Sequence, residues 1–119
     1  MKYLKIIAVL SFTAFFAFAC AQQQAKRAGI VISESKSYEA SLYRQNCAVC
    51  HGKEADGKES DGQKIPSLRY GDIRNKSEEE IYEQIANGKL PMPSFKNQLT
   101  DEEIRRMVRF IRKDLQGRD

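Results

Sequence analysis

The sequence is poor in the residues from which metal centres and disulfide frameworks are usually built. Its 119 residues include one histidine, His51, three cysteines and no tryptophan. A single histidine excludes a multi-histidine metal site and any mechanism in which a second histidine acts as a base. Three cysteines are too few for a disulfide framework. Charged residues make up 30% and hydrophobic residues 41%, which excludes a disordered chain and a protein with many membrane spans.

The N-terminus has the layout of a secretory signal peptide. Lys2 and Lys5 precede an uncharged apolar stretch over residues 6–19, which ends in small residues. We therefore predict a signal peptide over residues 1–19 and export of the mature chain, to the periplasm in a bacterium. The alternative is a transmembrane anchor, for which the stretch is short because a bilayer needs about 20 apolar residues.

Cys20 stands at the predicted cleavage site. The stretch Ala17-Phe18-Ala19-Cys20 resembles the lipobox of bacterial lipoproteins, in which the cysteine becomes the first mature residue and is lipidated. Ala17 replaces the usual leucine, and Phe18 replaces a residue that is usually small. Ordinary cleavage near Ala19 is the alternative. Lipidation would attach the chain to a membrane through residues 20–36, which lack a steady periodicity and are predicted to be a flexible tether.

The charge of the mature chain gives little support to nucleic-acid binding. Removal of the signal peptide also removes Lys2 and Lys5, which lowers the formal net charge from +4 to +2. The strongest basic feature left is one face of the last predicted helix, with Arg105, Arg106, Arg109, Arg112 and Lys113. Acidic residues begin that helix and suit its dipole, so we interpret the face as solvated and expect no nucleic-acid partner.

Residues 37–119 are predicted to form one all-α domain. Capping residues precede three amphipathic patterns, so we expect helices over residues 38–46, 78–87 and 101–115. Their N-terminal caps are Ser37, Ser77 and Thr100, of which the last two stand in capping boxes. No segment has convincing strand character, and residues 52–64 read as a polar, solvated loop.

The motif that carries chemistry is Cys47-Ala48-Val49-Cys50-His51, a C-x-x-C-H sequence. It is typical of haem c attachment, because two thiols so spaced at a helix end can add to the two vinyl groups of one haem while the next histidine binds the iron. A thioredoxin-like redox pair would need a βαβ pattern, which is missing. A four-ligand zinc site would need another Cys or His, and the mature chain offers only Cys20 far away. The sequence therefore predicts one covalently attached haem c.

A six-coordinate iron needs a second axial ligand, and in a chain with one histidine a methionine is the natural candidate. Met92 lies between Pro91 and Pro93, in a segment that can be neither regular helix nor central strand. Met107 falls on the apolar stripe of the last helix and is interpreted as a core residue. We therefore predict His51 and Met92 as the metal ligands; the alternative for Met92 is an ordinary buried loop methionine.

From Tyr38 to Leu115 the chain resembles a class I monohaem cytochrome c of the bacterial periplasmic type. The matching stretches follow the family's order and cover most of the mature chain: residues 42–52, 65–68, 92–95, 99–104 and 108–111. The resemblance implies a small helical fold around one covalently bound haem c, with crossed first and last helices.

The same resemblance assigns roles to particular residues. It implies that Tyr43 and Phe110 meet where the two helices cross. It implies that the Pro66 carbonyl accepts a hydrogen bond from His51 Nδ1, and that Pro66 and Leu68 belong to the cofactor site with Cys47, Cys50, His51 and Met92. Glu39 stands where the family often has a glycine, so a wider or shifted crossing is expected.

The function implied by the resemblance is one-electron transfer between redox partner proteins in an extracytoplasmic chain. Such a protein is a carrier, not an enzyme, and needs no small-molecule substrate. Two alternatives remain. The chain could be a haem c subunit or domain of a larger oxidase or dehydrogenase, or a gas-binding or enzymatic haem protein if Met92 is not a ligand.

Overall fold

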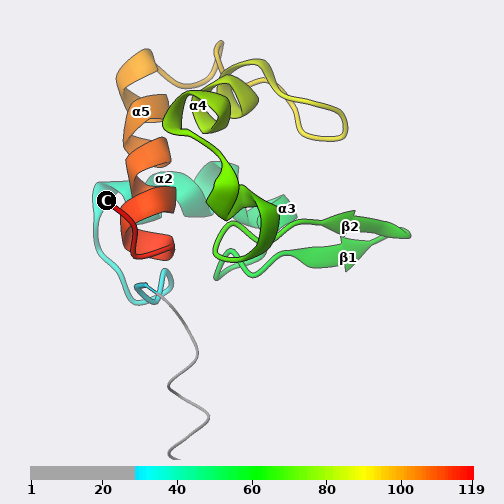
Figure 1. Cartoon of the computed structure of the whole chain (residues 1–119), viewed down its shortest axis with the longest axis horizontal. Helices are drawn as coiled ribbons and strands as arrows, with labels where there is room; N and C mark the ends of the chain where they lie inside the picture. The colour runs from blue at the N-terminus through cyan, green and yellow to red at the C-terminus, as the bar shows by residue number, and fades with distance from the viewer. Residues whose placement is uncertain (1–28) are drawn as a thin grey trace, which may run out of the picture.

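Three long helices form the framework of residues 29–119, the part of the chain that this computed structural model describes (Figure 1). Helix α2 spans Tyr38–Asn46, α4 spans Glu78–Asn87 and α5 spans Asp101–Arg109. Each helix starts at its predicted cap, where a hydroxyl accepts a hydrogen bond from a backbone N–H three residues on, and both capping boxes are complete. The predicted helix starts are therefore confirmed.

The last helix changes its winding near the C-terminus. After α5 the chain continues as a π-helix, η3, over Phe110–Leu115. The Gln116 N–H donates to the Ile111 carbonyl at 3.1 Å, a bond that spans five residues. The wider turns keep Phe110, Ile111 and Leu115 all buried against the core. The prediction of one regular α-helix over residues 101–115 is therefore wrong in its last part.

The segment between α2 and α4 holds the short elements. Helix α3 covers Ala48–His51, and a 3-10 helix, η2, covers Gly71–Asn75. Strands β1 (Lys58–Ser60) and β2 (Gln63–Ile65) pair antiparallel around a two-residue turn. Asp61 and Gly62 have φ angles of 51° and 74°, the left-handed conformation that such hairpin turns require. The expectation that no segment is a strand is therefore wrong at this hairpin.

Helices α2 and α5 cross, as Figure 1 shows, and an aromatic pair joins α2 to the start of η3. The rings of Tyr43 and Phe110 lie 6.2 Å apart between centroids and are tilted by 40°, within the range of favourable aromatic pairs. Met107, which the sequence places in the core, is 1% exposed. Glu39 lies at the edge of the crossing, where its carboxylate pairs with Arg106 at 3.1 Å.

Residues 29–35, which we call the N-terminal strap, pack against the domain. Ile32 is fully buried, and the Ile30 N–H donates to the Asp114 carbonyl at 2.9 Å. Arg44 donates to the carbonyls of Ile32 and Ser35 at 2.7 and 3.0 Å. This part of the predicted tether, residues 20–36, is therefore held in place, because its apolar side chain and its backbone groups both find partners. The predicted signal peptide, Cys20 and the remaining tether lie outside the described residues. No helix within residues 29–119 combines the length and the apolar character needed to cross a membrane.

Candidate functional site

The C-x-x-C-H motif lies on one tight turn that ends helix α2 and forms α3. The N–H groups of Cys50 and His51 both donate to the Cys47 carbonyl, at 3.1 and 2.9 Å. Cys47 is half-buried, Cys50 is exposed, and both are free thiols. The turn therefore brings two thiols and one imidazole together in the chain order that the motif predicted.

His51 is held in one tautomer by the chain that follows the hairpin. Its side chain is 8% exposed, and Nδ1 lies 3.0 Å from the Pro66 carbonyl oxygen. Because a carbonyl can only accept, Nδ1 donates its proton to Pro66 and Nε2 keeps its lone pair. Burial lowers the pKa of His51, with the Pro66 bond as an opposing influence. The ring is therefore neutral at pH 7, the form that binds a metal.

The Cys47 thiol lacks the low pKa that is typical of the attacking thiol of a redox pair. Burial raises the pKa of Cys47 to about 12, and the neighbouring Cys50 adds to the rise. A thiol of this kind is protonated at neutral pH and is a poor nucleophile for disulfide exchange. No group of three or more His, Cys, Asp or Glu side chains within residues 29–119 could hold a metal ion.

The loop after His51 is fixed from several directions. The Tyr43 hydroxyl donates to the Gly52 carbonyl at 2.7 Å, and burial raises the pKa of Tyr43, so the hydroxyl stays protonated. The Leu68 N–H donates to the Ala55 carbonyl at 2.9 Å, and the Leu68 side chain is 9% exposed within the core. The structure thus gathers Cys47, Cys50, His51, Pro66 and Leu68 in one region.

Met92 lies apart from them, on the loop between α4 and α5. Its backbone N–H donates to the Lys89 carbonyl at 2.8 Å, and the Lys89 N–H donates back to the Met92 carbonyl at 3.0 Å. The side chain is half-buried against the core, and its Sδ accepts a contact from Gln84 Nε2 at 3.6 Å. In Figure 1 this loop and α3 extend to the same side of the α2–α5 crossing.

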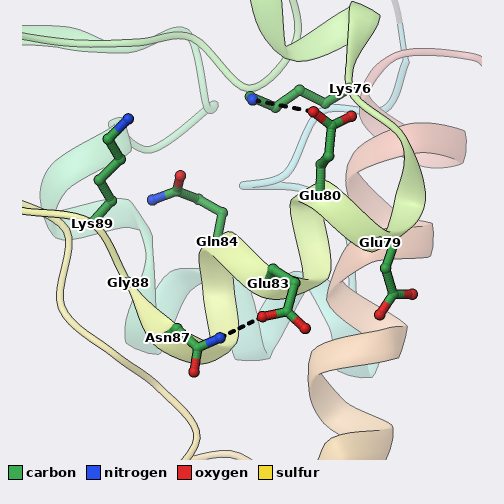
Figure 2. A pocket seen from close by; sticks show the side chains of 8 residues that line it. All are labelled: Lys76, Glu79, Glu80, Glu83, Gln84, Asn87, Gly88 and Lys89. Atoms are coloured by element: carbon green, nitrogen blue, oxygen red, sulfur yellow. Dashed lines mark hydrogen bonds and ion pairs between the residues drawn. The ribbon is translucent and has the colours of Figure 1, made fainter.

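A pocket of about 480 Å³ opens along α4 beside this loop. Figure 2 shows the Gln84 amide projecting from α4 into the space between Lys76 and Lys89. Lys76 also approaches Glu80, with 4.0 Å between the charged atoms. Gln84 thus connects this pocket to the sulfur of Met92, so the polar groups of α4 lie next to the predicted methionine ligand.

The basic face of α5 and η3 is balanced by acidic neighbours. Arg105 pairs with Asp101 at 2.9 Å, and Arg109 pairs with Glu102 at 3.1 Å. Arg112 reaches Glu78 on α4 at 3.3 Å. These side chains form a surface of alternating charge, as the interpretation of a solvated face predicts, rather than an unbalanced basic surface.

Comparison with known proteins identifies the family. The family model described as "Cytochrome C oxidase, cbb3-type, subunit III" matches residues 39–111, which is more than half of the chain. The chain belongs to this cytochrome c family. The chain is 32% identical over 81 residues to cytochrome c6 of Bryopsis maxima, covering 64% of this chain and 88% of the relative. Cytochrome c6 of Leptolyngbya boryana is 31% identical over 71 residues, with coverages of 59% and 81%.

A solved structure shares the fold of this cytochrome. The KustC0563 c-type cytochrome is 33% identical, with a TM-score of 0.51, and the match covers 60% of this chain and 89% of that one. The predicted all-α cytochrome c fold is therefore confirmed. Membership of the family makes the protein an electron carrier with one covalently bound haem c, and not an enzyme.

The donor set of the structure fits this cofactor. Two free thiols and a neutral imidazole with Nε2 available share one turn, and a thioether lies on a second loop. These are the groups that covalent attachment and axial ligation of haem c require.

Two partners of the site were missed in the sequence. The sequence predicts that Glu54 belongs to a solvated loop, but its carboxylate accepts the N–H groups of Ile32 and Ser33 at 2.8 and 2.9 Å. Arg69 is fully buried and donates to the Ile30 carbonyl at 2.7 Å and to Glu54 at 3.4 Å. Together they join the N-terminal strap to the loop that follows His51. A charge pair so far apart in sequence leaves no pattern that periodicity or spacing could detect.

Proposed function

We propose that this cytochrome carries single electrons outside the cytoplasm, with Cys47 and Cys50 as attachment residues and His51 and Met92 as axial ligands. The haem c iron supplies the one-electron couple. The observation that carries the proposal is the 3.0 Å bond between His51 Nδ1 and the Pro66 carbonyl. It orients the imidazole and leaves Nε2 for the metal, on the same turn as both thiols.

Each protein group has a defined task in this function. Pro66 fixes the ring of His51 and raises its basicity, which stabilises ferric iron. Met92 contributes a thioether, which favours ferrous iron. The buried apolar residues around Leu68 exclude water from the same region. If His51 and Met92 both held the iron, it would keep no position open to a reactant, as electron transfer without bond changes requires.

The test is the spectrum of the purified ferric holoprotein. A far-red charge-transfer band from methionine to iron, with a low-spin spectrum, is expected for His51 and Met92 ligation. A high-spin ferric spectrum would contradict it and support a gas-binding or enzymatic haem protein instead.

A second candidate is a haem c subunit of an oxidase, and the description of the matching family model favours it. The chemistry of the haem would be the same in both cases. Purification from native membranes under mild detergent separates the two: a carrier elutes alone, whereas a subunit elutes with its oxidase.

We also propose export through the signal peptide of residues 1–19 and lipidation of Cys20. The motivating observation is a cysteine at the end of an apolar stretch that follows Lys2 and Lys5. The N-terminal strap supports a shorter tether than residues 20–36, since the domain begins near residue 29. Cys20→Ser should release the protein from the membrane fraction with its spectrum unchanged. An unmodified mature N-terminus in mass spectrometry would contradict lipidation.

A further inference from the structure

Gly57 lies where the loop after His51 meets the segment that contains Pro66. Its φ angle is +79°, and its N–H donates to the His51 carbonyl at 3.0 Å. A Cβ at this position would lie 2.6 Å from the Ile65 carbonyl oxygen, 2.7 Å from the Ser67 nitrogen and 2.9 Å from the Pro66 carbonyl carbon. All three neighbours are backbone atoms, so no side-chain rotation could relieve the contact.

A glycine can be required for its positive φ angle or for the space that its missing side chain leaves. Gly62, in the turn of the same hairpin, shares only the first of these with Gly57. Its φ angle is +74°, close to that of Gly57, but a Cβ there would have no neighbour within 4 Å. Alanine at either position must therefore adopt the same unfavourable backbone conformation. Only alanine at Gly57 must also displace the backbone of residues 65–67.

We propose that Gly57 is a positioning residue for the haem ligand His51, because its missing side chain allows the Pro66 carbonyl to reach Nδ1. This inference rests on the proposed role of His51 as an axial ligand. Gly57 contacts both ends of the arrangement: its N–H holds the His51 backbone, and its bare Cα lies against Pro66 and its neighbours. A side chain there separates the two and lengthens the 3.0 Å bond from Nδ1 to the Pro66 carbonyl.

The electronic consequence has a definite sign. A hydrogen bond from Nδ1 to a carbonyl makes the imidazole a stronger donor to the metal. Ferric iron gains more from a strong donor than ferrous iron does. Weakening the bond therefore favours the ferrous state, and the reduction potential rises.

The experiment compares the reduction potentials of Gly57→Ala and Gly62→Ala holoproteins with that of the wild type. The potential of Gly57→Ala is expected to rise above both of the others, with the far-red methionine band retained. In the ferrous protein, exchange of the His51 Nδ1 proton with solvent should be faster in Gly57→Ala than in Gly62→Ala. Equal potentials and equal exchange rates in the two variants would overturn the proposal.

A third variant decides the question if Gly57→Ala does not accumulate with haem. The Ser67 hydroxyl donates to the Ala55 carbonyl at 3.1 Å and holds the same segment against the loop. The same hydroxyl accepts the N–H groups of Arg69 and Tyr70 at 3.0 and 3.2 Å. Ser67→Ala removes all three bonds without adding atoms, so it should loosen the segment and raise the potential in the same direction. A wild-type potential in Ser67→Ala would then overturn the proposal. The wild-type ferric spectrum keeps the two proposals apart. If it lacks the methionine band and low-spin iron, the proposed Met92 ligation fails, whereas this inference needs only His51 as a ligand and is still decided by the comparison of the glycine variants.

Discussion

The two loops that carry the proposed axial ligands are held in different ways. The loop after His51 is bound by other parts of the chain: the Glu54 carboxylate accepts the N–H of Ile32, 22 residues away, and the Pro66 carbonyl, 15 residues away, reaches the imidazole. The loop of Met92 is bound by its own neighbours. Ser94 donates to the Ala86 carbonyl at 2.6 Å, and the chain pairs with itself between Lys89 and Met92.

The exposure of the two proposed ligands differs in the same direction. His51 is 8% exposed, whereas Met92 is half-buried. Segments with few long-range contacts open at a lower free-energy cost than segments tied into the core. We therefore expect the Met92 side to respond first to destabilising conditions, while the His51 side keeps its structure until the domain unfolds.

The largest effect is expected from loss of the covalent attachment of haem, on which both proposed ligands depend. Cys47→Ala combined with Cys50→Ala removes both thioethers, so the protein should retain no haem on a denaturing gel stained for haem. Val49→Ala is the matched control, because Val49 lies between the two cysteines and is 73% exposed. Haem retention at the wild-type level in the double variant would refute the attachment assignment.

The second effect separates the proposed methionine ligand from the buried one. Met92→Ala should change the ferric spectrum from low spin to high spin and lower the reduction potential, because a thioether favours ferrous iron. Met107→Ala should keep the spectrum and lose about 2–5 kcal/mol of unfolding free energy, because Met107 is 1% exposed and its truncation leaves a cavity. The reverse pattern would assign the ligand to Met107. Spectra and denaturant titrations of the same samples measure both quantities.

The His51 side could be predicted from sequence only in part. Cap residues and apolar spacing predict α2, α4 and α5, because these signals are local. The C-x-x-C-H motif is equally local. The bond from His51 to Pro66 is predicted only by the resemblance to a family, since nothing in the residues themselves pairs positions 15 apart.

The missed features have identifiable physical causes. The N-terminal strap depends on Glu54, 22 residues from Ile32, and on Arg69, 39 residues from Ile30. A single buried isoleucine shows no periodicity, so the segment reads as a tether. The dipeptide Asp61-Gly62 is typical of a hairpin turn, but the strands on either side are polar and show no alternating pattern, so the sequence favours a loop. The change from α5 to η3 left no recognisable signal in the sequence.

The third effect tests whether the N-terminal strap stabilises the His51 side of the domain. Ile32→Ala should lower the free energy of unfolding by about 2–5 kcal/mol, because Ile32 is fully buried. Val31→Ala is the matched control, since the adjacent Val31 is 39% exposed and should change stability little. Chemical denaturation followed by helical circular dichroism measures both. Equal stabilities would mean that the strap is not part of the folded domain.

The smallest effect tests a single bond on the His51 side. Tyr43→Phe removes the 2.7 Å hydrogen bond to Gly52 but keeps the ring that packs against Phe110. The expected loss is about 0.5–1.5 kcal/mol, the net value of a neutral hydrogen bond. Tyr38→Phe is the control. The Tyr38 hydroxyl donates to Glu103, but Tyr38 is 52% exposed, so water replaces the lost partner. Because the Tyr43 hydroxyl is shielded from water and the Tyr38 hydroxyl is not, Tyr43→Phe should lose more stability than Tyr38→Phe in the same denaturation assay, with the methionine band intact. A loss of that band in Tyr43→Phe would show instead that the two loops are coupled and that the contrast between them does not hold.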